Sequence, residues 1–260
     1  MSSIQLIGVL HLPPLPGAPG FRLDNGGLSG IVERICEEAR VLEKTRFDSL
    51  ILENFGDTPF YKTNVPAETI ASMAIVAQAV RSAVKLPLGI NVLRNDGRAA
   101  LGIAAACGAR FIRVNVLSGV AATDQGIIEG NAAELMREKQ RLCPDVQVLA
   151  DVHVKHAQSL SSKDIGLAVE ETALRGGAHG VIVTGETTGR SAASADLKRA
   201  SEVARVHRIP LYLGSGATPQ NVSEWRAFVD GVIIGSAIRE GGRAGAALDA
   251  SRAQSIRSVL

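Results

Sequence analysis

Three chemically versatile side chains alternate along one short segment of the chain. Asp151, His153 and Lys155 occupy every second position directly after the apolar run 148–150. In a β-strand, such residues project from one face, and neighbours in this series lie about 7 Å apart along the strand. A carboxylate and an imidazole suit general acid and base catalysis, and a lysine stabilises negative charge or, if burial lowers its pKa, forms an imine. We therefore predict catalytic roles for Asp151, His153 and Lys155. The structural alternative has Asp151 bind loop amides and leaves Lys155 as a solvated charge on the rim.

A second carboxylate, Glu53, ends the apolar run 49–52. Strand alternation points it inward, where a carboxylate is costly unless it is paired or used. Glu53 is therefore a fourth candidate catalytic residue. Arg113, between Ile112 and Val114, could pair with Glu53 or with Asp151, which would make the paired acid structural. Both interpretations stay open at this point.

Other apolar runs also end in polar residues, which we predict to contact the substrate. They are His11, Asn91, Asn115 and Thr184. The last two runs end in glycine-rich loops, namely Gly214-Ser215-Gly216 and Gly235-Ser236. Glycine lets backbone N–H groups approach an anion, and a following helix N-terminus adds its positive dipole. These two loops predict a phosphate or other anion site, to which Arg239 could add charge.

A divalent metal is an alternative use of the same side chains. His11, Glu53, Asp151 and His153 offer the nitrogen and oxygen donors that zinc or manganese accepts. Their spacing matches no ligand motif, so the sequence implies no cofactor firmly.

The elements that must position these residues alternate strictly along the chain. Eight apolar strand-like runs each precede a helical stretch, and they cover 4–10, 48–53, 87–92, 111–116, 146–152, 180–184, 210–213 and 230–235. The helices are expected at 28–46, 67–85, 96–107, 131–142, 164–175, 195–207, 219–227 and 244–257. Strict alternation of β and α requires parallel strands, and eight units favour a closed (β/α)8 TIM barrel of the α/β class. We predict one domain over residues 1–260, with the active site at the carboxyl ends of the strands.

Composition limits the partners and the location. The 28 basic and 26 acidic residues give a net charge of +2, without the basic runs or interleaved aromatics that mark nucleic-acid binding. A small molecule is the expected partner. Three cysteines without metal-type spacing read as reduced thiols, and no apolar run is long enough to span a membrane. We expect a cytoplasmic protein. Peripheral membrane association and a homo-oligomer are both compatible with the sequence.

Across almost its whole length the chain resembles the BtpA/SgcQ family of TIM-barrel proteins. The matching stretches include GVLHLPPLPG at 8–17, ENFGD at 53–57, GINVLRND at 89–96, RVNV at 113–116, ADVHVKH at 150–156 and GSG at 214–216. One branch of this family is linked to photosystem I biogenesis at membranes, and the other is named as a nucleosidase or sugar-pathway protein. Residues 236–240 depart from the threonine and lysine expected in the family, so a basic contact in that loop would depend on Arg239.

Two functions follow as hypotheses. The first is an enzyme that acts on a small phosphorylated or ribosyl-containing metabolite, as a nucleosidase, phosphosugar lyase or isomerase, with acid/base chemistry at the barrel mouth. The second is a noncatalytic assembly or biogenesis factor that uses the barrel as a scaffold, because fold alone does not determine function. On the catalytic hypothesis, Asp151→Asn and Lys155→Ala should abolish turnover and leave folding nearly intact.

Overall fold

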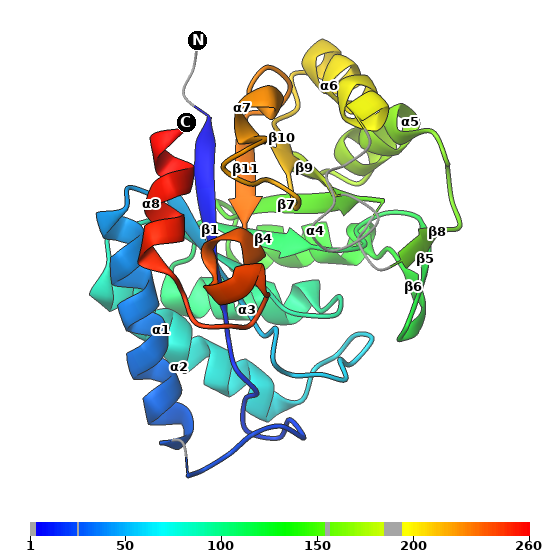
Figure 1. The fold of residues 1–260 in the computed structure, drawn as a ribbon. Coiled ribbons are helices and arrows are strands. Elements are labelled where there is room, and N and C mark those ends of the chain that lie inside the picture. Colours follow the sequence, from blue (N-terminus) through cyan, green and yellow to red (C-terminus); the bar gives the residue numbers. More distant parts are fainter. Residues whose placement is uncertain (1–3, 25, 154–156, 185–193) are drawn as a thin grey trace.

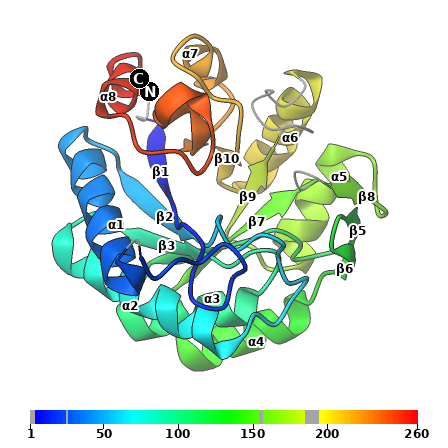
Figure 2. The ribbon, with the colours of Figure 1, turned by 60° about the horizontal axis from the view of Figure 1, so that its bottom comes forward.

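The computed structural model describes residues 4–24, 26–153, 157–184 and 194–260. Its parallel strands close a barrel in the order β1-β11-β10-β9-β7-β4-β3-β2 (Figures 1 and 2). They are β1 Gln5–His11, β2 Ser49–Glu53, β3 Leu88–Asn91, β4 Phe111–Val114, β7 Gln147–Val152, β9 Gly180–Val183, β10 Leu211–Leu213 and β11 Gly231–Ile234. The predicted TIM barrel is confirmed, and each strand lies within two residues of its predicted bounds.

Helices surround the barrel, as Figure 2 shows. They are α1 Gly27–Lys44, α2 Ala67–Ala83, α3 Gly97–Cys107, α4 Ala132–Leu142, α5 Ile165–Glu170 with the π-helical turn Glu171–Arg175, α6 Ser194–His207, α7 Val222–Trp225 and α8 Ala250–Ser258. Aspartates cap three of them, because Asp96, Asp164 and Asp249 accept backbone N–H bonds from the first turns of α3, α5 and α8. Among the described helices, none combines the length and apolar character needed to cross a bilayer.

The last two predicted helices are shorter than expected. The segment predicted as helix 219–227 is helical only over Val222–Trp225, because Asn221 holds a turn by bonding Thr218 N and Gly216 O. The helix predicted at 244–257 starts at Ala250. Gly245 has a φ of +80°, which favours glycine and is incompatible with a right-handed helix, and the segment before it forms 3₁₀ turns at Ser236–Ile238 and Glu240–Gly242.

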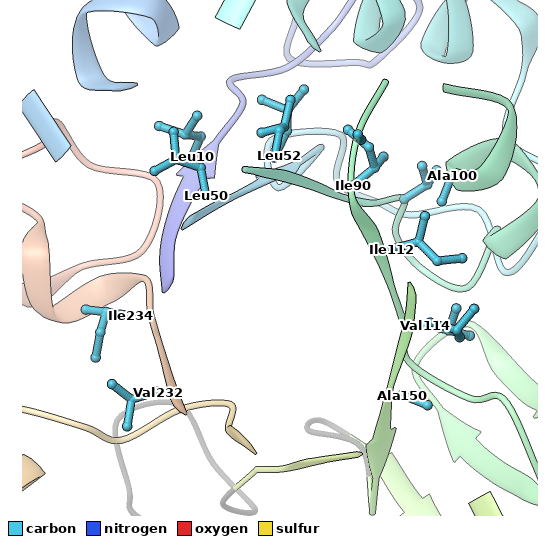
Figure 3. Packing of buried hydrophobic residues seen from close by; sticks show 14 of the residues in the cluster. Leu10, Leu50, Leu52, Ile90, Ala100, Ile112, Val114, Ala150, Val232 and Ile234 are labelled. Atoms are coloured by element: carbon cyan, nitrogen blue, oxygen red, sulfur yellow. The ribbon is translucent and has the colours of Figure 1, made fainter. Parts of the chain in front are cut away.

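Both faces of the barrel strands are buried, as a parallel sheet requires. Outward side chains such as Leu10, Leu52 and Ile112 point away from the middle of the ring and pack under the helices (Figure 3). The inward side chains form a separate apolar cluster, which consists of Ile7, Val9, Ile51, Phe111, Leu149, Ile182 and Ile233, with Tyr212 packed against it. This inner cluster fills the lower barrel and leaves the polar strand ends above it.

Gly89 makes room for the largest ring in that inner cluster. A Cβ atom at this position would lie 2.1 Å from Phe111 Cε2. We expect Gly89→Ala to destabilise the protein by about 1–3 kcal/mol, as overpacked cores do. Urea denaturation measures this change. The matched control is Gly102→Ala in α3, where a Cβ meets no atom within 4 Å and where alanine favours the helix. Equal midpoints for the two variants would contradict the packing argument.

A small antiparallel sheet next to α5 was not foreseen. It joins β5 Val120–Thr123, β6 Gly126–Glu129 and β8 Ala157–Ser159 in the order β6-β5-β8 (Figure 1). These strands come from the long loops after β4 and β7, where the sequence predicts neither a strand nor a helix. Val116, Ala121 and Ile128 form a small core of their own beneath it.

Candidate functional site

The polar strand ends meet at the carboxyl end of the barrel. His11 pairs in register with Glu53, Glu53 with Asn91, and Asn91 with Arg113, on four adjacent strands. All four positions share the inward alternation of the apolar cluster beneath them. A continuous polar layer therefore lies at the barrel mouth. It contains the predicted site residues His11, Glu53 and Asn91 and the candidate ion-pair partner Arg113.

A cavity of about 180 Å³ opens above this layer, and we call it the mouth cavity. Of the predicted residues, those that line it are His11, Glu53, Asn115, Gly214, Ser215, Gly216, Gly235 and Ser236. The cavity is also lined by Arg113, Arg94, Phe55 and Phe60. The structure thus brings together both glycine loops and one candidate catalytic carboxylate.

The glycine loops approach the cavity closely because they lack side chains. A Cβ on Gly214 would lie 2.4 Å from Thr184 Cγ2, and one on Gly235 would lie 3.1 Å from His11 Cε1. Gly216 has a φ of +81°, which favours glycine. Between Gly214 and Gly216, the buried hydroxyl of Ser215 has no hydrogen-bond partner among the described residues. A buried polar atom of this kind indicates a missing ligand or water.

Arg113 and Asp151 form a buried ion pair below the cavity. Arg113 Nε donates to Asp151 Oδ2 and Nη2 donates to Oδ1, both at 2.9 Å, and Asn115 Nδ2 donates to Oδ2 at 2.9 Å. Burial alone lowers the pKa of Arg113, but the charge and hydrogen bonds of Asp151 outweigh it and the net direction is upward. The sequence left open whether Arg113 pairs with Glu53 or with Asp151, and in the structure it pairs with Asp151. The two oxygens of this carboxylate accept three side-chain hydrogen bonds, which fix it in position.

Glu53 and His11 lie together on the other side of the mouth. His11 Nε2 is 3.9 Å from Glu53 Oε1, and the imidazole stacks on Phe55 with ring centroids 4.5 Å apart. Gly245 N donates to His11 Nδ1 at 3.3 Å. In the neutral imidazole this bond places the proton on Nε2, which faces Glu53. The pair can therefore hold and move a proton at the cavity wall.

Arg94 is a site residue that the sequence reasoning missed. It is 7% exposed and lines the mouth cavity. Burial lowers the pKa of its guanidinium, and the charges of Asp151, Asp124 and Glu53 oppose that shift. Arginine stays protonated, so Arg94 brings positive charge to the cavity. It follows Asn91, the last residue of β3, by three residues, where strand alternation gives no direction for a side chain.

Besides Asp151, which lines a neighbouring cavity, four predicted site residues lie away from the mouth cavity or outside the described residues. Asn91 is buried beneath it and donates to Arg113 O and Asn115 Oδ1. His153 lines a smaller neighbouring cavity and its Nε2 lies 2.9 Å from Ser162 O. Thr184 donates to His153 O at 3.3 Å. Lys155 lies outside the described residues.

Arg239 does not reach the anion loops, and the expectation that it would add charge there is wrong. Its side chain is fully buried and pairs with Glu38 on α1 at 2.9 Å. It also donates to Val9 O and Ala246 O. The guanidinium therefore binds Glu38 and two main-chain carbonyls. These contacts connect the segment after β11 to β1 and α1.

The four residues considered as metal ligands do not converge. His11 and Glu53 are neighbours, whereas Asp151 binds Arg113 and His153 contacts Ser162. Within the described part of the chain, no group of three or more His, Cys, Asp or Glu side chains is arranged to hold a metal ion.

Solved structures share this fold at low sequence identity. Phosphoribosyl anthranilate isomerase from Thermus thermophilus superposes with a TM-score of 0.61 over 98% of each chain at 12% identity. 3-Hexulose-6-phosphate synthase gives a TM-score of 0.60 over 99% of this chain and 100% of that chain at 16% identity. At these identities the likeness shows the TIM-barrel fold.

Sequence relatives are much closer. An uncharacterized protein of Pyrococcus horikoshii is 47% identical over 92% of this chain and 88% of its own length. The photosystem I biogenesis protein BtpA of Synechocystis is 42% identical over 95% of this chain and 84% of its own length. The family model described as the BtpA family matches residues 3–260. The chain therefore belongs to the BtpA family.

Proposed function

We propose that this protein is an enzyme that acts on a small phosphorylated or ribosyl-containing metabolite at the mouth of its barrel. The observation that carries the proposal is the composition of the mouth cavity. Two glycine loops and Arg94 line the same cavity as Glu53 and His11, and the Ser215 hydroxyl in one of these loops has no hydrogen-bond partner among the described residues. A scaffold has no evident need to gather anion-binding and proton-transferring groups at one place.

The anion end of the substrate is assigned to the glycine loops. In many TIM barrels, the loops after the seventh and eighth strands bind phosphate through backbone N–H groups. Gly214, Ser215, Gly216, Gly235 and Ser236 occupy those loops here. The names of the two solved structures above, a phosphoribosyl anthranilate isomerase and a hexulose-6-phosphate synthase, refer to phosphorylated compounds and support this assignment.

The acid/base step is assigned to Glu53 with His11. Glu53 can accept a proton from a substrate carbon or from water, and the Nε2–H of His11 stabilises the carboxylate. In a nucleosidase, the same carboxylate would stabilise an oxocarbenium-like centre or activate water. Asp151 holds Arg113 in place beside the substrate, which makes it a positioning residue in this proposal. A direct catalytic part for His153 and Lys155 stays a prediction from the sequence.

The alternative is a noncatalytic assembly or biogenesis factor. The observation that favours it is the name of the Synechocystis relative, a photosystem I biogenesis protein. A barrel that converts none of the phosphorylated metabolites offered to it would support this alternative. The cytoplasmic location, single domain and homo-oligomer remain predictions from the sequence.

Ligand-dependent thermal unfolding tests the anion site. Inorganic phosphate or a phosphosugar at about 100 times its Kd should stabilise the protein by about 2.7 kcal/mol, or about 5–10 °C in Tm for a domain of this size. Gly216→Asp should remove the shift, because it places a negative charge in the loop. Gly216→Asn is the matched control, since it carries the same backbone strain at a φ of +81° without the charge. The anion assignment fails if no phosphorylated compound shifts the wild-type protein.

A further inference from the structure

A second cavity lies beside the mouth cavity, and we call it the side cavity. It measures about 310 Å³ and lies between the loops after β1, β2 and β3 and the first turn of α2. Phe60 and Leu93 line both cavities. The loop after β2 also serves both, because Phe55 faces the mouth cavity while Asn54 and Asp57 face the side cavity. The two spaces are therefore neighbouring compartments with a common wall.

Five of the twelve residues that line the side cavity have rings. Pro19, Pro59, Phe60, Tyr61 and Pro66 surround it, together with Val65 and Leu93. Rings and prolines present flat, rigid apolar surfaces against which a planar group can stack. The volume is about ten times the 30 Å³ that one water occupies in the liquid, so the cavity has room for a ring system.

Charge distinguishes the two compartments. Asp57 is the one acidic side chain that lines the side cavity, and no basic residue lines it, whereas the mouth cavity is lined by Arg94 and Arg113 as well as by Glu53. A phosphate would be repelled from the first compartment, whereas Arg94 and the glycine loops would attract it to the second. A ligand that occupies both must therefore place its anionic end at the glycine loops.

Asp57 provides the one charged hydrogen-bond acceptor among the residues that line this compartment. Its Oδ1 accepts from Leu15 N at 2.8 Å, and its Oδ2 accepts from Asn54 Nδ2 at 3.2 Å. A carboxylate has about four acceptor positions, so each oxygen can accept a further bond. Burial raises the pKa of the Asp57 carboxyl, and the two hydrogen bonds oppose that shift. An N–H donor on a bound ring would satisfy the remaining acceptor positions.

We propose that the side cavity is a second subsite of the same binding site, and that it takes a planar heterocycle bearing an N–H donor. This inference rests on the proposed function, because the heterocycle belongs to the ligand whose phosphate binds the glycine loops. It narrows the substrate class from any phosphorylated metabolite to one that carries both a phosphate and a nitrogen heterocycle.

Calorimetric titration with four probes tests the two subsites separately. The probes are inorganic phosphate, ribose 5-phosphate, adenosine and adenosine 5′-monophosphate. We expect the nucleoside monophosphate to bind about tenfold tighter than ribose 5-phosphate, in line with the strength of stacking between bases and aromatic side chains. Adenosine should bind more weakly than the nucleoside monophosphate, because it lacks the anionic end.

Three alanine-to-leucine variants locate the effect. Ala18 lines the side cavity and Ala244 lines the mouth cavity, whereas Ala71 is exposed on α2 and lines neither. Ala18→Leu should reduce the affinity for the nucleoside monophosphate to that for ribose 5-phosphate and leave the latter unchanged. Ala244→Leu should weaken both ligands, and Ala71→Leu should change neither. If Ala18→Leu does not fold, Tyr61→Ala replaces it, because Tyr61 is 59% exposed and its loss removes a stacking surface at little cost to folding.

The two failures are distinguishable. The subsite proposal is overturned if the nucleoside monophosphate binds no tighter than ribose 5-phosphate, or if its advantage survives both Ala18→Leu and Tyr61→Ala. The proposed function fails instead if phosphate and ribose 5-phosphate show no binding that Gly216→Asp removes. Adenosine binding that Ala18→Leu abolishes would support the heterocycle subsite even in that case.

Discussion

Asp151→Asn is expected to lower the free energy of unfolding by about 3–5 kcal/mol, the usual cost of breaking a buried ion pair by removing one partner. The Arg113 side chain is 9% exposed and that of Asp151 is fully buried, so the variant leaves a guanidinium in the barrel without its counter-charge. The sequence alone favoured a nearly intact fold for this variant, and the bidentate geometry reverses that expectation. Urea denaturation followed by circular dichroism measures the change.

Two comparisons separate this effect from a general loss of charge. Glu138→Gln breaks an equally short Arg–carboxylate pair, since Arg141 Nη2 lies 2.7 Å from Glu138 Oε1, but that pair is on the surface and its loss should change stability little. The double variant Arg113→Met/Asp151→Asn should recover much of the loss, because no unpaired charge remains buried. Asp151→Asn with wild-type stability would show that the pair is not a structural support of the barrel.

Strand alternation accounts for how much of the site the sequence could predict. His11, Glu53 and Asn91 end three adjacent strands, and a period of two fixes which face each side chain takes. Once the strands close a barrel, inward positions at the carboxyl ends must meet at its mouth. The same reasoning placed Gly214 and Gly235 in the two loops beside them. Local pattern and closure together were sufficient for these residues.

The role of Arg239 could not be read in the same way, because it depends on a residue two hundred positions away. Arg239 follows a glycine loop, which suggested a ligand contact, yet its partner is Glu38 on α1. One signal was present in the sequence. Glu38 stands seven residues after Ile31 and three after Ile35, on the apolar stripe of its helix, so it is buried and needs an opposite charge. Only the tertiary fold identifies which charge meets it.

The small outer sheet escaped prediction for a different reason. Its hairpin turns through Asp124 and Gln125, and Gly126 at a φ of +96° opens the second strand. The flanking runs are short and half exposed, so their alternation is weak. Their third partner, Ala157–Ser159, comes from another loop. When strands from two separate loops pair, the pairing leaves no periodic pattern in the local sequence that could predict it.

Glu53→Gln is expected to reduce turnover by about 10²–10⁴-fold, the usual contribution of a positioned general acid or base. The amide keeps the size of the carboxylate and its place beside His11 but cannot accept a proton. Ligand-induced thermal stabilisation by a phosphosugar should persist, because the glycine loops that hold the anion are unchanged. Turnover is measured by proton and phosphorus NMR on the phosphorylated compounds that stabilise the wild-type protein.

The comparison of binding with turnover also decides between the two functions. Glu37→Gln is the matched control, since Glu37 is exposed on the outer face of α1 and should be dispensable for both measurements. If Glu53→Gln retains full turnover, the proton-transfer role must belong to another residue, and His153 and Lys155 become the next candidates. If the wild-type protein binds phosphorylated ligands and converts none of them, the barrel mouth is a receptor site. The biogenesis role then gains support, because the anion loops and the Glu53–His11 pair would serve recognition without chemistry.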